Sequence, residues 1–214
     1  MPVQAPEGSR EDAAKGGRHH PDHKGRSRRA SYQLRKGARQ AGTVAAPPWG
    51  LSTCGPGETA AFGRLLGATA PPGAVALLAG PVGAGKTVLA GGLLEGLGVA
   101  GPHPSPTFPL VRAYQGRLGA AHLDLYRVEP APAAALDPDP WGIGLAELLD
   151  GGAVVVVEWP DRLGPWAPSD ALRIRLSGPG GEERRELRLV AGGPVARAWL
   201  GGARRAARER GLWP

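Results

Sequence analysis

Short apolar runs alternate along this chain with segments whose apolar residues recur at helical spacing. Residues 73–80 (GAVALLAG) are an apolar run bounded by Pro-Pro and Gly, a pattern that predicts a buried strand. Residues 86–98 carry apolar side chains at helical spacing and end on Gly98, a candidate C-cap. The Val-rich run at 153–158 (AVVVVE) does not alternate, which predicts a strand buried on both faces.

Two longer segments predict paired strands. Residues 107–127 contain two apolar stretches separated by a turn signal at Gln115–Gly116, and we expect two strands joined there. Residues 171–191 alternate apolar and charged side chains on each side of GPGG, which predicts an edge hairpin with one face in water.

Three further segments predict helices. Residues 57–69 favour a short helix that begins near Ser52 or Thr53, and residues 139–152 favour another. Residues 194–210 predict an amphipathic helix with Arg on its outer face. This succession of elements predicts an α/β fold with three layers, and the two hairpins make its central sheet mixed and partly antiparallel.

The basic character of the chain is concentrated at its N-terminus. Residues 1–46 hold ten Lys and Arg against four Asp and Glu, whereas residues 47–214 hold 16 against 15. Residues 1–46 also lack large apolar residues and periodicity, so we expect a disordered basic extension. It could contact nucleic acid through phosphates, or be a solvated extension or the product of a misplaced start codon. We expect the folded domain at 47–192 and an Arg-rich C-terminal helix at 193–214.

The overall composition narrows the class of protein. Glycine accounts for 35 of 214 residues and asparagine is absent, so single Gly, Pro and Arg residues carry less information than usual. One cysteine, Cys54, excludes a disulfide framework and fits a reducing cytosol. No stretch approaches the roughly 18 consecutive apolar residues of a membrane span, so we expect a cytoplasmic protein with no membrane partner.

The clearest motif connects the strand predicted at residues 73–80 to the helix predicted at residues 86–98. Residues 80–87 (GPVGAGKT) match the P-loop pattern G-x-x-x-x-G-K-[ST]. Glycines let successive N–H groups point at a polyphosphate, and the helix N-terminus adds partial positive charge. Lys86 could then reach the outer phosphates, and the Thr87 hydroxyl could ligate Mg²⁺. Lys86 is the only lysine after position 36, whereas the other basic positions of the domain are Arg, which cannot replace a compact ammonium in this role.

Two acids follow predicted strands. Glu158 ends the Val-rich run, where a second Mg²⁺ ligand is expected in a P-loop protein; alternatively it is a solvated carboxylate just past a strand. Asp124, with Leu on both sides, could serve the same site or simply occupy the polar side of an alternating strand. The guanine-specific [NT]-K-x-D element cannot occur after Lys86, because the chain has no later lysine, so we expect ATP.

Four stretches in order resemble one family. They are GPVGAGKT, SPTF at 105–108, HLDLYR at 122–127 and VEWP at 157–160. With the segment ETAAFGRLLG before the loop, they are similar to the bacterial TsaE (YjeE) family over roughly residues 50–190. That family comprises small ATPases required for threonylcarbamoyladenosine (t6A) modification of tRNA.

The resemblance implies roles for individual residues. It implies that Lys86, Asp124 and Glu158 are catalytic and that Thr87 and Glu158 hold Mg²⁺. The residues implied to bind the nucleotide are Thr59, Gly83, Ala84, Gly85, Lys86, Thr87, Val88, Thr107 and Trp159. Of these, Thr107 could instead be a turn residue and Trp159 a core residue.

The resemblance also implies the cellular role. Family members bind a complex of TsaD and TsaB, which transfers a threonylcarbamoyl group to tRNA, and ATP hydrolysis resets that complex. Contact with tRNA is then only indirect, and hydrolysis is expected to be slow without the partners. Arg127 or Arg162 could supply positive charge near the acids. The alternative is a P-loop kinase acting on a small molecule, which would share Lys86, Thr87 and Glu158.

Overall fold

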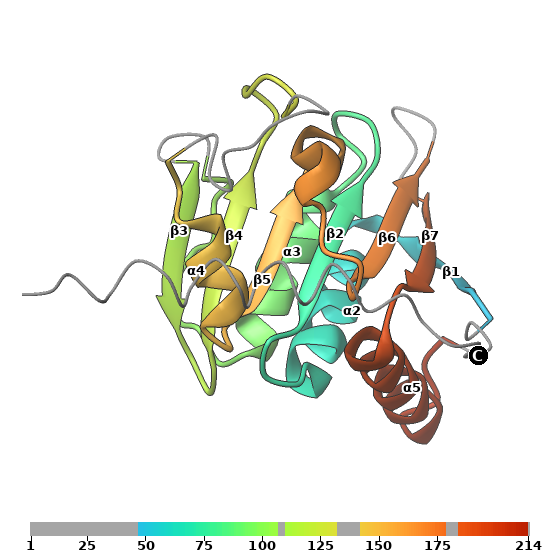
Figure 1. Ribbon diagram of the computed structural model, residues 1–214. Coiled ribbons are helices and arrows are strands. Elements are labelled where there is room, and N and C mark those ends of the chain that lie inside the picture. Colours follow the sequence, from blue (N-terminus) through green and yellow to red (C-terminus); the bar gives the residue numbers. More distant parts are fainter. Residues whose placement is uncertain (1–46, 107–109, 132–141, 179–183, 214) are drawn as a thin grey trace, which may run out of the picture. The chain divides into compact units, whose positions relative to one another are not determined.

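The computed structural model describes residues 47–106, 110–131, 142–178 and 184–213, which all belong to one compact unit of the chain. The described elements form a single sheet with helices packed against it (Figure 1). In chain order they are β1 (Trp49–Cys54), α2 (Gly55–Thr69), β2 (Val75–Ala79), α3 (Lys86–Gly96), β3 (Val111–Gln115), β4 (Gly119–Asp124), α4 (Leu145–Asp150), β5 (Val154–Glu158), the 3₁₀ helix η1 (Pro160–Trp166), β6 (Leu172–Ser177), β7 (Arg184–Ala191) and α5 (Pro194–Glu209).

The sheet has the strand order β1-β7-β6-β2-β5-β4-β3 (Figure 1). The four strands β6, β2, β5 and β4 run parallel, whereas β3, β7 and β1 pair antiparallel with their neighbours. The expected mixed, partly antiparallel α/β sheet is therefore confirmed. Ligands of such sheets bind beyond the carboxyl ends of the parallel strands, and β2, β4 and β5 bring their carboxyl ends to the same edge.

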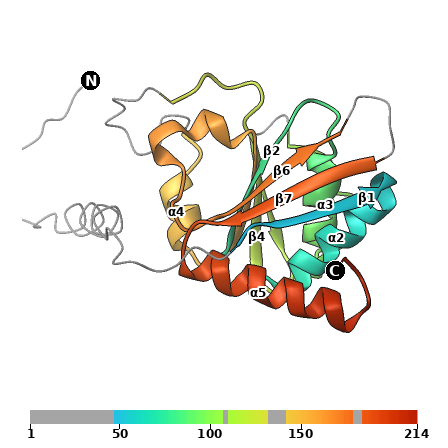
Figure 2. The same ribbon diagram turned by 90° about the vertical axis from the view of Figure 1, so that its right-hand side faces the viewer.

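Helices cover the two faces of the sheet unequally, as the edge-on view in Figure 2 shows. Helices α2, α3 and α5 share a core with the inner residues of β1, β2, β5, β6 and β7. On the opposite face, α4 and η1 lie over the β2-β5-β4 half (Figures 1 and 2). Val154–Glu158 is accordingly buried throughout, as the sequence predicted. The fold has three layers over this half of the sheet and two over the β6-β7-β1 half.

The hairpin predicted at the edge of the sheet is not at the edge. β7 pairs with both β6 and β1, so the outermost strand on this side is β1, Trp49–Cys54, which we did not expect. Ser52 and Thr53 accordingly lie in β1 rather than at a helix start. Cys54 is the residue that caps α2, and its N–H donates to Glu58 Oε2 at 2.7 Å. The expectation of one wet face is confirmed, because buried and exposed side chains alternate along β6.

Helices α2 and α3 approach each other closely enough to require glycine. A Cβ at Gly63 or Gly67 of α2 would lie 2.4 Å from Leu89 O or 2.0 Å from Leu93 O of α3. Conversely, a Cβ at Gly92 or Gly96 of α3 would lie 2.2 Å from a carbonyl oxygen of α2. These distances are far below contact distance, so the two helix backbones touch at four glycines. Gly98, which follows α3 with φ +78°, has the left-handed conformation expected of a C-capping glycine.

The C-terminal helix α5 is amphipathic, as predicted, and packs on the same face as α2. Its buried side includes Trp199, whose Nε1–H donates to the Leu66 carbonyl at 3.0 Å. Its last turn carries Arg208 on the exposed side, and the helix belongs to the same compact unit as the sheet. In the described ranges, no helix combines the length and apolar character needed to cross a bilayer.

Candidate functional site

The P-loop, Gly80–Thr87, connects the end of β2 to the start of α3. Gly85 caps the helix with φ +96°, and Gly83 has φ +77°, conformations that side chains other than glycine rarely adopt. A Cβ at Gly80 would lie 2.4 Å from Leu176 O, whereas a Cβ at Gly83 would meet nothing within 4 Å. Gly80 is therefore needed for packing against β6, and Gly83 for the backbone turn on an open side of the loop.

Lys86, the first residue of α3, folds its side chain back over the loop. Its Nζ donates to Gly80 O at 2.9 Å and to Pro81 O at 2.8 Å, and only 4% of the residue is exposed. Burial lowers the pKa of Lys86, and the negative charges of Glu158 and Asp124 oppose that shift. The ammonium is thus held beside the loop, on the side where the two acids lie.

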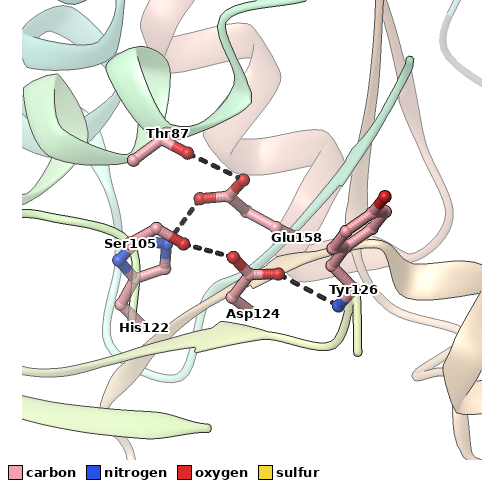
Figure 3. A network of polar contacts seen from close by, with 6 residues as sticks. All are labelled: Thr87, Ser105, His122, Asp124, Tyr126 and Glu158. Carbon is pink, nitrogen blue, oxygen red and sulfur yellow. Dashed lines mark hydrogen bonds and ion pairs between the residues drawn. The ribbon is translucent and has the colours of Figure 1, made fainter. Parts of the chain in front are cut away.

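Glu158, the last residue of β5, is bonded through both carboxylate oxygens (Figure 3). Its Oε2 lies 3.0 Å from Thr87 Oγ1 and its Oε1 lies 2.9 Å from His122 Nε2. Because an ionised carboxylate only accepts hydrogen bonds, both neighbours donate, and the lone pairs of Thr87 Oγ1 stay available. Glu158 is 2% exposed, so it is not the solvated carboxylate that was the alternative interpretation.

Asp124, the last residue of β4, stands directly opposite Glu158 in the parallel register. Its Oδ2 accepts from Ser105 Oγ, and its Oδ1 accepts from the Tyr126 N–H at 3.0 Å (Figure 3). The strand does not alternate between wet and dry sides, because Leu123, Asp124 and Leu125 are all buried. The interpretation of Asp124 as the polar side of an alternating strand is therefore wrong, and its carboxylate is held in a fixed direction.

Trp159 follows Glu158 in the left-handed conformation, with φ 60° and ψ 51°. For a residue with a large side chain this backbone costs on the order of 1–3 kcal/mol, which the surroundings must offset. The turn places the indole ring 3.9 Å from Lys86 Nζ and 4.8 Å from the Tyr126 ring, measured to the ring centroid in each case. Trp159 is only partly buried, so it covers the lysine rather than filling the core.

The other predicted site residues have different placements. Thr59, on α2, is buried against the loop, with its Cγ2 3.8 Å from the position of a Cβ on Gly85, but its hydroxyl bonds to Thr53 Oγ1 and Gly55 O. Ala84 is buried, and Val88 is half-buried in the first turn of α3. Thr107 lies outside the described residues.

The two candidate arginines differ in exposure. Arg127 is exposed in the turn after β4, and Arg162 is half-buried in η1. The Arg162 carbonyl accepts from the Ala131 N–H at 2.8 Å, a backbone contact that joins η1 to the segment after β4.

The polar network contains two side chains that we did not single out, His122 and Ser105 (Figure 3). His122 lies two residues before Asp124 on the same strand, so the two side chains share one face of the sheet. That spacing was visible in the sequence. The contact with Glu158 was not, because it depends on which strand lies beside β4.

Comparisons with known proteins identify the family. A model of the family described as "Threonylcarbamoyl adenosine biosynthesis protein TsaE" matches residues 55–187, which include the P-loop and all members of the network. The chain belongs to the TsaE family. The family membership predicted from the four sequence stretches is therefore confirmed. The family takes part in t6A biosynthesis.

Individual TsaE relatives cover most of their own length in these matches. A protein of Nostoc sp. named tRNA threonylcarbamoyladenosine biosynthesis protein TsaE is 41% identical over 121 residues, which is 56% of this chain and 72% of the relative. The TsaE protein of Bacillus subtilis is 37% identical over 133 residues, or 62% and 79% of the two chains. The crystal structure of YdiB from Bacillus subtilis superposes with a TM-score of 0.63 at 29% identity, covering 77% of this chain and 99% of YdiB.

Proposed function

We propose that this TsaE chain binds and hydrolyses Mg-ATP, and that hydrolysis resets a TsaB–TsaD threonylcarbamoyl-transferase complex during t6A modification of tRNA in the cytoplasm. The observation that carries the proposal is the 3.0 Å contact between Thr87 Oγ1 and Glu158 Oε2. It joins a hydroxyl at the start of the P-loop helix to a buried carboxylate at the end of the neighbouring strand. Mg²⁺ is typically bound by one or two protein oxygens together with substrate phosphates, and this pair fits that pattern.

The P-loop residues would bind the polyphosphate. The N–H groups from Gly83 to Thr87 lie at the start of α3, where the helix adds partial positive charge. The Lys86 ammonium now bonds to two loop carbonyls, and we expect it to exchange them for outer phosphate oxygens. Mg²⁺, when bound, would neutralise charge that develops on the phosphates.

Asp124 would act on the water molecule that attacks ATP. Ser105 and the Tyr126 N–H fix its two oxygens, and it stands beside Glu158 in the register. A carboxylate held in this way can orient a water molecule for attack on the terminal phosphate.

The test measures phosphate release from ATP by the full chain, alone and with TsaB and TsaD. We expect slow release by the chain alone and faster release with both partners, because a partner can supply or order charge for the transition state. Transfer of phosphate to a small-molecule acceptor would instead support a kinase. Absence of ATP binding would contradict the proposal outright.

Substitution of Lys86 tests whether ATP is bound by the P-loop or by the general positive charge of the domain. Lys86→Ala should remove ATP binding, measured as fluorescence of a labelled ATP analogue. Arg175→Ala removes one positive charge from an exposed position on β6 and should leave binding unchanged. Equal loss of binding in both variants would mean that the nucleotide is held by overall charge and not by the loop.

A further inference from the structure

His122 is a buried side chain with one hydrogen-bond partner among the residues that the structure describes. It is 0% exposed, and its Nε2 lies 2.9 Å from Glu158 Oε1. Its other nitrogen, Nδ1, has no hydrogen-bond partner in the part of the chain that the structure describes. Burying an imidazole with one nitrogen unsatisfied costs free energy, so a role in packing alone would be served better by an apolar residue.

The register of the sheet places His122 where it can act on Glu158. His122 stands opposite Val156 of β5, two pairs before Asp124 and Glu158, so its side chain lies on the same face of the sheet as theirs. Glu158 therefore has His122 on one oxygen and Thr87 on the other (Figure 3). With both oxygens engaged, rotation of the carboxylate would break one hydrogen bond or both.

We propose that His122 is a positioning residue, which holds Glu158 Oε1 through Nε2 and so keeps Oε2 beside Thr87 Oγ1 as the metal-binding pair. This inference rests on the Mg-ATP site proposed above. Groups that orient a metal ligand from behind commonly contribute about 10- to 100-fold to metal affinity, and a buried imidazole donor is suited to that work. His122 need not touch nucleotide, metal or water to have this effect.

The experiment compares two amide substitutions that differ in reach. In His122→Gln the amide nitrogen can occupy the place of Nε2 and donate to Glu158, whereas in His122→Asn it lies near the place of Nδ1 and falls short. Both amides bring similar polarity into the buried site. Thermal unfolding of both variants reports any general loss of structure.

Two binding measurements then separate the role of His122 from that of the loop. The first is the affinity for a fluorescent ATP analogue with EDTA present, which we expect to be unchanged in both variants. The second is the affinity for Mn²⁺ with a non-hydrolysable ATP analogue bound, measured by electron paramagnetic resonance. We expect His122→Asn to weaken Mn²⁺ binding about 10- to 100-fold, and His122→Gln to restore most of it.

The possible results are distinguishable from failure of the proposed function. Wild-type Mn²⁺ affinity in His122→Asn, or equal losses in both variants together with lost metal-free nucleotide binding, would overturn the positioning role. If the wild-type chain binds Mn²⁺ and nucleotide but hydrolyses no ATP, the proposed function fails while the His122 comparison still decides its own question. If the wild-type chain binds neither, both proposals fail.

Discussion

The two halves of the sheet use polar residues in opposite ways. In the β2-β5-β4 half, helices cover both faces, and each acid at a strand end is buried and bonded through both oxygens. In the β6-β7-β1 half, one face is open and carries Arg175, Glu186 and Arg188. A shallow depression of about 640 Å³ on that face is lined by these residues and by none of the predicted site residues. Charged residues occur in both halves, but they are buried and bonded where helices cover both faces of the sheet and exposed to solvent where one face is open. Coverage by helices, more than residue type, therefore distinguishes the half that holds the candidate site.

The first prediction compares one glutamate from each half. Glu158→Ala should lower Mg²⁺-dependent ATP turnover about a hundredfold or more, because metal-assisted stabilisation of transition-state charge amounts to several kcal/mol. Glu186→Ala, which changes an exposed residue of β7, should leave the rate unchanged. The measurement is phosphate release at saturating ATP and Mg²⁺, and similar rates in both variants would remove the distinction between the halves.

The second prediction tests burial in the two halves. Leu123 is 0% exposed on β4, whereas Val190 on β7 is 38% exposed. Leu123→Ala should lower the free energy of unfolding by about 2–5 kcal/mol, because it removes buried contacts and leaves a cavity. Val190→Ala should change it by no more than about 0.5 kcal/mol. Denaturant unfolding of the two variants measures both values, and a large cost at Val190 would mean that the open face is covered in solution.

The third prediction concerns the helix layer that both halves share. Gly92→Ala should lower the free energy of unfolding by about 1–3 kcal/mol, since the added methyl would collide with the Ala60 carbonyl of α2. A Cβ at the neighbouring Gly91 would lie 3.7 Å from His103 Cβ, which is an ordinary contact distance. Gly91→Ala should therefore raise the free energy of unfolding by about 0.4–1 kcal/mol, because it reduces the conformational entropy of the unfolded chain. If thermal unfolding shows the same change for both variants, the close helix contact is not present.

The smallest expected effect lies on the open face. Arg175 and Arg188 stand directly opposite each other on β6 and β7, and like charges in that position are destabilising. Arg188→Gln should therefore raise the free energy of unfolding by about 0.2–1 kcal/mol at low salt, and less at high salt. Arg184→Gln is the control, because Arg184 faces Cys54 and donates to Ser52 Oγ at 3.0 Å. A gain that does not depend on salt would contradict the explanation by charge.

The parts of the fold that the sequence predicted are those with local signals. The P-loop lies between the strand and helix expected around it, and the Val-rich strand ends at a buried Glu158. By contrast, β1 was missed although Trp49, Leu51 and Thr53 alternate with exposed or partly exposed residues. Its stability depends on pairing with β7, some 130 positions later in the chain, and no local pattern contains that partner.

The same limit applies to the candidate site. Asp124 and Glu158 could each be placed at a strand end, because each follows an apolar run. Their direct opposition, and the bond between His122 and Glu158, follow from β4 lying beside β5. The spatial order of strands is a property of the whole sheet. The sequence therefore predicts individual residues of the network but not the contacts between them.

The four glycines between α2 and α3 have a mechanical consequence for the loop. Where two backbones touch, a slide of less than one helical turn would press the flanking side chains of one helix into the other. The part of α3 from Leu89 to Gly96 is therefore held against α2, and a tilt of one helix requires movement of the other. We therefore expect α2 and α3 to move little when a ligand binds at the P-loop. We expect rearrangement on binding instead at Trp159, whose ring centroid lies 3.9 Å from Lys86 Nζ.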